Sequence, residues 1–439
     1  MNWFNLSLRL NGFPISKARG VLKQIQGISP EHYPQHIEER RTEIVTHHLK
    51  NNAFYRSLNA NTAYSNWGDL PVMTKRDLQV PIASRLSEGF KPKRVYINKT
   101  SGSSGDPFIF AKDKWCHALT WAVIMDRFSW YDIDVNRSSQ ARFYGIPLDK
   151  KGYYKERFKD WLGNRYRFSV FDLSQTAFER CLNKFSNTAF NYINGYTSAI
   201  VQFAKFLDSK GIILSSVCPS LKVCMVTSEM LFEDDKTLME RVFGIPIVNE
   251  YGASELDLIA FQHPDGRWLL NNETLYVEIL DENDQPLPNG QEGRVVITSL
   301  FNKAHPFIRY DIGDIGIISE GHGPNNTVLE KLIGRTNDIA YLPSGKKAAG
   351  LTFYYITKSI IEDDGNVKEF IIIQLKKDLF KIQYTSDTEL DSGEKEVIAN
   401  EMINYLERGI RIEFERLSKL ERSKSGKLKQ FISKINQES

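Results

Sequence analysis

The sequence predicts an α/β protein with two or more domains, and three observations lead to that prediction. The chain has 439 residues, which is too long for one typical hydrophobic core. Between residues 143 and 255, apolar runs alternate with helical patterns, and polar residues follow the apolar runs. From about residue 268 the pattern changes to alternating strands joined by turns, which indicates a β meander or a small barrel.

Composition and charge exclude several classes of protein. Hydrophobic residues make up 41% and charged residues 25%, as in ordinary globular proteins. The 57 basic and 54 acidic side chains nearly cancel to +3, which gives no electrostatic case for nucleic acid. We find no apolar run long enough for a membrane span and no signal-peptide pattern at the N-terminus. Four cysteines in a chain of this length indicate a reducing compartment and no disulfide framework, so we expect a cytoplasmic protein in which Cys218 and Cys224 are buried free thiols.

Residues 1 to about 60 are expected to form helices. Ile44, Val45 and Leu49 follow an acidic and basic run at helical spacing. No acidic or cysteine partner completes a ligand set with the histidines of this segment, so a solvated helix is favoured over a metal site. A further helix is expected to begin at Thr74, which is a plausible N-cap.

A turn rich in glycine and hydroxyl groups separates two apolar runs, 94–97 and 108–110. Glycine allows a backbone to approach a ligand closely, and successive N–H groups in such a turn can hold an anion. An ordinary Ser/Gly hairpin loop is the alternative interpretation. The candidate phosphate-binding residues are Thr100, Ser101, Gly102, Ser103, Ser104 and Gly105.

Two continuous apolar runs, Leu221–Val226 and Ile245–Val248, are typical of strands that are covered on both faces. Polar residues follow each run, at 227–229 and 249–255, which predicts a ligand crevice at the strand ends. We also expect helices over 115–130, 199–207 and 394–406. Further strands are expected over 143–147, 275–280, 293–298, 370–375 and 380–384. A basic segment, 423–429, lies near the end of the chain.

Five stretches, in order along the chain, resemble motifs of the adenylate-forming superfamily: the phosphate loop, Tyr251–Glu255, the segment ending in Asp314, Gly-Arg335-x-x-Asp and Ser-Gly-Lys427. The stretches 71–75 and 306–311 resemble in particular the phenylacetate–CoA ligase-like group, including the CapK-type proteins of capsule and O-antigen clusters. The resemblance implies a large N-terminal adenylation domain, 1–335, with layered α/β sheets and a small β-barrel-like part. A small mobile α+β domain, 336–439, would follow a hinge near 336–338.

The same resemblance assigns roles to individual residues. The phosphate loop would hold the leaving phosphates, Tyr251 would stack on adenine, and Asp314 would bind the ribose. Glu255 would hold Mg²⁺, while Arg335 would contact ribose or phosphate and Lys427 would bridge the substrate carboxylate and the α-phosphate. The further residues expected at the nucleotide are Ser228, Glu229, Glu250, Gly252, Ala253 and Ser254. Tyr144, Tyr196 and Gly252 are expected to line the acyl pocket. One departure is Asp106, which stands where the phosphate loop usually has lysine.

The resemblance implies ATP- and Mg-dependent formation of an acyl-AMP from a carboxylic acid, followed by transfer to coenzyme A. The first alternative is transfer to an amine, such as an amino acid or a sugar, in surface-polysaccharide assembly. The second is a non-catalytic nucleotide-binding protein, although no loss of a site residue supports it. The acid, the acceptor and the oligomeric state stay open, with a homodimer among the alternatives.

Overall fold

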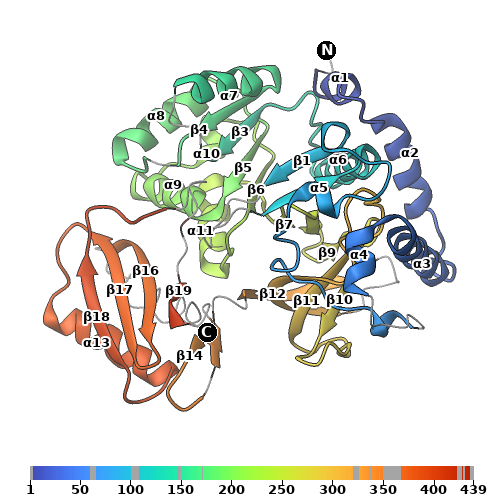
Figure 1. The fold of residues 1–439 in the computed structure, drawn as a ribbon. Helices are drawn as coiled ribbons and strands as arrows, with labels where there is room; N and C mark the ends of the chain where they lie inside the picture. The colour runs from blue at the N-terminus through green and yellow to red at the C-terminus, as the bar shows by residue number, and fades with distance from the viewer. Residues whose placement is uncertain are drawn as a thin grey trace.

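The computed structural model describes residues 3–59, 66–99, 108–145, 150–170, 172–319, 326–335, 339–345, 347–349, 367–422, 428 and 431–435. Its centre is one sheet of eleven strands, and a separate four-stranded sheet lies beside it (Figure 1). In order across the large sheet the strands are β10 (Leu275–Leu280), β11 (Gly293–Ser299), β12 (Tyr310–Ser319), β13 (Val328–Arg335), β9 (Trp268–Leu270), β8 (Asp257–Gln262), β7 (Ile247–Ala253), β6 (Val223–Thr227), β5 (Tyr192–Tyr196), β3 (Gln140–Phe143) and β4 (Arg165–Phe168).

The half of the sheet from β4 to β7 is parallel. Every residue of β6 is buried, as the continuous apolar run at 221–226 predicts for a strand covered on both faces. Every residue of β5 is buried as well, although no strand is expected there from the sequence. The α/β class expected from the sequence is therefore confirmed. β7 extends to Ala253, so the polar residues expected just after this strand include its last residues.

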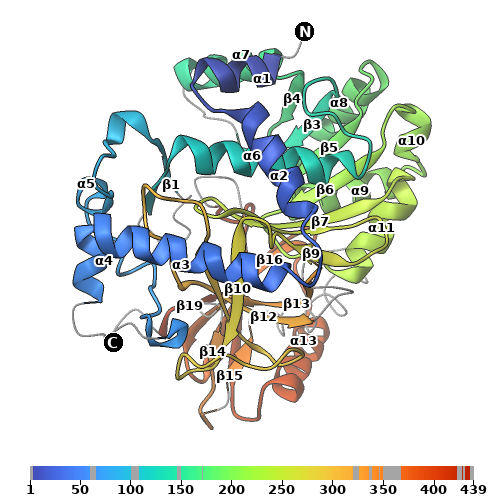
Figure 2. The same cartoon turned by 90° about the vertical axis from the view of Figure 1, so that its right-hand side faces the viewer.

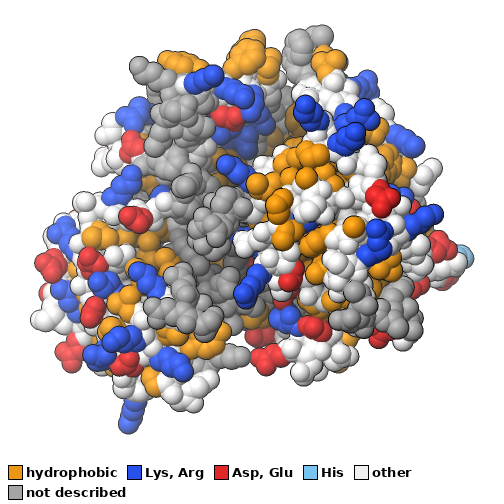
Figure 3. All heavy atoms as spheres, in the orientation of Figure 1, with side chains coloured by type: hydrophobic (Ala, Val, Ile, Leu, Met, Phe, Trp, Pro, Cys, Tyr) orange, Lys and Arg blue, Asp and Glu red, His pale blue; other side chains and the backbone are white. Residues whose placement is uncertain are grey.

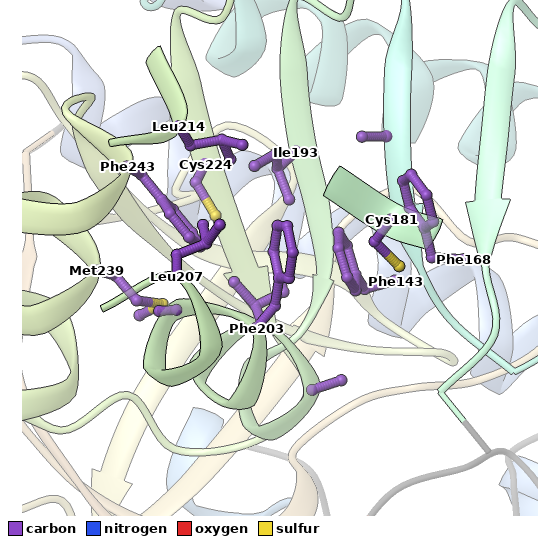
Figure 4. Close-up of a cluster of buried hydrophobic side chains, with 14 of the residues drawn as sticks. Phe143, Phe168, Cys181, Ile193, Phe203, Leu207, Leu214, Cys224, Met239 and Phe243 are labelled. Carbon is purple, nitrogen blue, oxygen red and sulfur yellow. The ribbon is translucent and has the colours of Figure 1, made fainter. Parts of the chain in front are cut away.

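Helices cover both faces of the parallel half. On one face Phe143, Phe203 and Cys224 belong to a cluster of buried side chains (Figure 4). The helices that supply this layer are α8 (Gln175–Ser186), α9 (Thr197–Ser209), α10 (Leu214–Val217) and α11 (Glu233–Phe243). On the other face Tyr192 and Met225 pack beneath α2 and α6, which cross the strands in Figure 2. That layer contains α1 (Trp3–Leu10), α2 (Ile15–Gln26) and α6 (Lys114–Ser129), and α7 (Lys150–Leu162) packs beside β4.

The N-terminal helices agree with the sequence, but the helix expected at Thr74 is wrong. The Thr74 backbone N–H and hydroxyl both donate to Asp77 Oδ2, at 2.8 and 2.7 Å, and close a turn. Met73 is held extended because its N–H donates to Arg309 O and its carbonyl accepts from Asp311 N. This tertiary pairing overrides the local capping signal. The elements before α6 also include α3 (Tyr33–Asn51), α4 (Ala53–Leu58), η1 (Trp67–Asp69), α5 (Ile82–Arg85), η2 (Pro92–Arg94), β1 (Tyr96–Lys99) and β2 (Ile109–Lys112).

The strands after residue 255 are antiparallel. β10, β11, β12 and β13 form the expected meander, with each strand paired to the next. They do not form a separate small barrel, because β13 pairs with β9 and β8 pairs with β7. The meander thus continues the same sheet, with β10 and β4 at its two ends.

The C-terminal sheet has the strand order β18-β17-β16-β19. Its elements are β16 (Val367–Lys376), β17 (Leu379–Ser386), α13 (Ser392–Tyr405), β18 (Arg411–Arg416) and β19 (Phe431–Ser433), and a hairpin of β14 (Ile339–Tyr341) and β15 (Lys347–Ala349) precedes them. The side chain of Gln374 joins the hairpin to this sheet by bonds to the backbone of Tyr341. The division at residue 336 stays a prediction, since the expected hinge, 336–338, lies outside the described residues.

The four cysteines are buried and none is disulfide-bonded, as expected. None of the helices that the structure describes has both the length and the apolar character that crossing a membrane requires.

Candidate active site

A cavity of about 270 Å³ lies on the face of the sheet beneath α1 and α6. One wall is apolar and comes mainly from the helices: Phe4, Trp121, Ile124, Phe128 and Val135. The other wall is the sheet and the residues at its strand ends: Gln140, Arg142, Tyr144, Gly163, Arg165, Tyr192, Asn194, Thr227, Ser228, Glu250, Gly252, Ala253, Ser254, Asp257 and Leu258. The cavity therefore reaches the carboxyl ends of β6 and β7, where the sequence predicts a ligand crevice.

Most of the residues expected at the substrate lie on this cavity. Thr227 pairs with Glu250 across β6 and β7, so both motifs meet at one edge of the sheet. Tyr144 lines the cavity, and its hydroxyl donates to Asn194 Oδ1 at 2.9 Å. Tyr196, which was also expected to line the acyl pocket, is not among the lining residues and packs against Tyr144, with 4.8 Å between the ring centroids.

The carboxyl group of Glu250 has an altered environment. Burial raises the pKa of Glu250 to about 7, and the Thr227 hydrogen bond and the Arg142 charge offset only part of that effect. Near neutral pH this carboxyl is therefore poised between its charged and neutral forms. Arg165, on the same wall, also has its pKa shifted toward the neutral form by burial.

Tyr251 and Asp314 contact each other directly. The Tyr251 hydroxyl donates to Asp314 Oδ2 at 2.6 Å, and both side chains are buried. Asp314 on β12 stands opposite Arg335 on β13 in the antiparallel register. The structure thus brings together three motif positions that are separated by up to 84 residues in the sequence.

Glu255 is buried and accepts a hydrogen bond from the Tyr310 hydroxyl at 3.1 Å. This bond orients the carboxylate without supplying a positive charge. Among the residues that the structure describes, no group of three or more His, Cys, Asp or Glu side chains is placed to hold a metal ion. A single carboxylate fits Mg²⁺, which binds proteins through few carboxylates together with substrate phosphates and water.

Sequence reasoning missed an ion pair that supports the Tyr251–Glu255 motif. Buried Lys112, on β2, pairs with Asp257 and also donates to the carbonyl of Ser254 at 3.3 Å. The Thr120 hydroxyl donates to Asp257 Oδ2 at 2.8 Å. Only the lysine at the end of an otherwise apolar run could have indicated such a buried charge.

Ser228 and Glu229 are neighbours in the sequence, but Ser228 faces the cavity and Glu229 contacts other parts of the chain. Ser228 lines the cavity and adopts a φ of 72°, which is rare for a residue with a side chain. Glu229 Oε2 accepts from Ser198 N at 2.7 Å, and Oε1 accepts from Leu428 N at 3.2 Å. Burial raises the pKa of Glu229, and these backbone hydrogen bonds act against it. Glu229 therefore joins the large sheet to the C-terminal part of the chain.

The remaining expected site residues, Thr100 to Gly105 and Lys427, lie outside the described residues.

Comparisons with known proteins show similarities in sequence and in fold. The phenylacetate–coenzyme A ligase of Pseudomonas putida is 22% identical over 336 residues, which cover 73% of this chain and 74% of that enzyme. No family model matches the sequence.

Solved structures share the fold. 2-Hydroxyisobutyryl-CoA ligase in the postadenylation state, in complex with 2-HIB-AMP, superimposes with a TM-score of 0.69 at 15% identity, over 93% of this chain and 91% of that one. The same ligase in the thioesterification state gives 0.58 at 15% identity, over 92% and 90% of the two chains. The amide bond synthetase McbA from Marinactinospora thermotolerans gives 0.53 at 16% identity, over 79% and 70%.

The chain therefore has the fold of the adenylate-forming superfamily, which confirms the resemblance expected from its sequence. Within that superfamily its sequence is similar to the phenylacetate–CoA ligases.

Proposed function

We propose that this protein activates a carboxylic acid with ATP and Mg²⁺ and then transfers the acyl group to coenzyme A. The observation that carries the proposal is the cavity that ends at Gly252–Ser254, next to the buried Tyr251–Asp314 pair. The similarity to phenylacetate–CoA ligases supports the choice of acid and thiol as substrates.

In the first step a carboxylate oxygen attacks the α-phosphorus of ATP, the bond to the β-phosphate bridging oxygen breaks, and pyrophosphate leaves. In the second step the thiol sulfur of coenzyme A attacks the acyl carbon, AMP leaves, and the thiol proton passes to solvent. Both steps depend on positioning and on stabilisation of negative charge.

Each side chain has a distinct task in this proposal. Asp314 accepts hydrogen bonds from the ribose hydroxyls, and its bond from Tyr251 fixes its orientation. Glu255, oriented by Tyr310, holds Mg²⁺, which neutralises phosphate charge when bound. Lys427 and the 100–105 loop supply positive charge and hydrogen-bond donors around the phosphates.

The test is pyrophosphate release over a panel of carboxylic acids with ATP and Mg²⁺, followed by chromatography for the CoA thioester. Glu255→Gln should reduce Mg²⁺-dependent pyrophosphate formation by about 10²–10³, as loss of a charge contact in the transition state does. Glu88→Gln is the matched control, because Glu88 is exposed and pairs only weakly with Arg56 at 3.6 Å. Equal turnover in the parent and Glu255→Gln would rule out the assigned role of Glu255.

The alternative acceptor is an amine, as in amide formation during capsule or O-antigen assembly. The similarity in fold to an amide bond synthetase supports the amine as an alternative acceptor. Incubation of enzyme-formed acyl-AMP with coenzyme A or with amino acids and amino sugars separates the two acceptors. ATP binding without pyrophosphate release from any acid would instead support a non-catalytic nucleotide-binding protein.

A further inference from the structure

The sheet wall of the cavity is unusually polar for its position. A central parallel strand is ordinarily apolar on both faces. On the cavity face Gln140 and Arg142 of β3 stand beside Tyr192 and Asn194 of β5, while Arg165 of β4 stands opposite Gln140. The opposite face of the same strands is a normal apolar core (Figure 4). A local departure from the apolar pattern, confined to the face of a cavity, indicates a binding function.

The charges on this wall do not balance locally. Buried Asp160 is the nearest carboxylate, and Arg167 occupies both of its oxygens, with Nε to Oδ2 at 2.9 Å and Nη2 to Oδ1 at 3.1 Å. Arg142 and Arg165 approach the same Asp160 Oδ1 only at 3.7 and 3.4 Å. Three guanidinium groups therefore share one carboxylate, and Arg167 has the best geometry. Arg167 also pairs with Glu156 at 3.0 Å.

The two less well paired arginines have unused hydrogen-bond donors. Arg142 Nε is buried and has no hydrogen-bond partner among the described residues. Arg165 Nε is also buried and forms no hydrogen bond there, although it faces Asp160 Oδ1 at 3.4 Å, and Arg165 Nη2 donates to the carbonyl oxygen of Lys159 at 3.3 Å. Burial lowers the pKa of Arg165, and the positive charge of Arg142 lowers it further. Arg142 also lies over the Tyr144 ring at 4.7 Å, which restricts its guanidinium plane. Buried donors without acceptors are costly, and an anion between them would remove that cost.

One other acid faces Arg142, namely Glu250. Its charge is incomplete near neutral pH because burial raises its pKa to about 7, so it offsets the positive charge of Arg142 only in part. Figure 3 shows Lys and Arg side chains gathered around a hollow in the upper middle of this face, where Figure 1 draws β3 and β4.

From these contacts we propose that the acid activated by this protein carries a second anionic group, and that Arg142 and Arg165 bind that group. The proposal rests on the proposed adenylation, since it places the reacting carboxylate at Gly252–Ser254, at the other side of the same cavity. Strands β3 and β7 are three strand spacings apart, about 14 Å between backbones, and side chains fill part of that span. The space suits a short dicarboxylic acid such as glutarate or adipate, extended along the apolar wall.

The test compares acids of equal chain length with and without the second carboxylate: pentanoate with glutarate, and hexanoate with adipate. Pyrophosphate release should favour each dicarboxylate by about 10²-fold in kcat/KM, the size expected for a charge-assisted contact. Arg142→Met and Arg165→Met should each raise the KM for the dicarboxylate about tenfold or more and leave the KM for ATP within twofold. Arg241→Met is the matched control, because Arg241 is exposed and pairs with Asp208 on the protein surface.

A second measurement keeps the proposal separate from the proposed reaction. Calorimetry with glutarate, without ATP, should show binding to the parent that is lost in Arg142→Met, provided that circular dichroism shows the variant folded. If no acid is adenylated but glutarate binds through Arg142, the proposed reaction fails and the anion site stands. Preference for monocarboxylates, or unchanged glutarate binding and turnover in both variants, would overturn the anion site. Higher turnover with a phosphate-bearing acid than with either dicarboxylate would keep the site and change the identity of its anion.

Discussion

Asp314 shares its carboxylate with the Tyr251 hydroxyl, and this contact determines how its role at the nucleotide can be tested. Asp314→Ala should weaken AMP binding about tenfold or more, because it removes charge-assisted hydrogen bonds to the ribose worth about 1.5–3 kcal/mol each. The change also leaves the buried Tyr251 hydroxyl without its acceptor. Calorimetry on Asp314→Ala and on Tyr251→Phe separates the two effects, since Tyr251→Phe removes the internal bond and keeps the carboxylate. AMP affinity within twofold of the parent in Asp314→Ala would contradict the ribose assignment.

For single residues, the sequence predicted the motif residues but not the side chains that they contact. Tyr251, Glu255 and Asp314 could be found because motifs are local in sequence. The Tyr251–Asp314 contact and the Lys112–Asp257 pair join residues far apart in the chain, so no spacing rule reveals them. The arginines of β3 and β4 alternate with apolar residues in the sequence, which was a visible sign of a strand with one polar face.

Among the elements, β7 is constrained by close backbone packing at Gly252. Its register with β8 shifts between Tyr251 and Gly252, and a Cβ at Gly252 would lie 2.7 Å from the carbonyl oxygen of Asp257. Gly252→Ala should therefore displace the Ser254–Asp257 turn. We expect a loss of stability of about 1–3 kcal/mol, typical of overpacking, together with reduced pyrophosphate release. Thermal unfolding followed by circular dichroism measures the first effect.

The matched control is Gly20→Ala on α2. Gly20 is exposed and nothing lies within 4 Å of an added Cβ. Alanine should stabilise that helix by about 0.5–1 kcal/mol. A Gly252→Ala protein as stable and active as the parent would show that the turn accommodates the methyl group and that glycine is not required there.

Elements with strong internal periodicity were predictable, and those fixed by tertiary contacts were not. The apolar runs 221–226 and 245–248 indicate strands by themselves, and the structure has β6 and the start of β7 there. The segment at Thr74 carries a helix-start signal, yet pairing of Met73 with β12 holds the chain in another conformation. The antiparallel meander was expected. It belongs to the same sheet as the parallel strands because β8 and β9 pair between them, and the local sequence pattern does not predict that pairing.

For the whole molecule, we propose that the C-terminal domain adopts one orientation for adenylation and another for acyl transfer, and this proposal makes a prediction about Lys427. If the C-terminal domain closes over ATP only for the first step, Lys427→Ala should slow acyl-adenylate formation by about 10²–10³. Transfer from chemically synthesised acyl-AMP to the acceptor should stay close to that of the parent. Stopped-flow measurement of each half-reaction tests this, with Lys419→Ala as the control basic residue. Equal loss in both half-reactions, or in neither, would contradict domain alternation.

The segment from Ser228 to Phe232 belongs to two parts of the molecule at once. Ser228 lines the cavity, whereas Met230 and Phe232 pack in the hydrophobic core of the C-terminal sheet. A ligand that holds Ser228 in its unusual backbone conformation would favour docking of the C-terminal sheet. Because thermodynamic linkage is reciprocal, docking of that sheet would then strengthen ligand binding by the same free energy. Release of the C-terminal sheet after adenylation would expose Phe232 to water and break the Glu229–Leu428 bond. If the C-terminal domain moves as we propose, the occupancy of the cavity and the docking of the C-terminal sheet would therefore depend on each other.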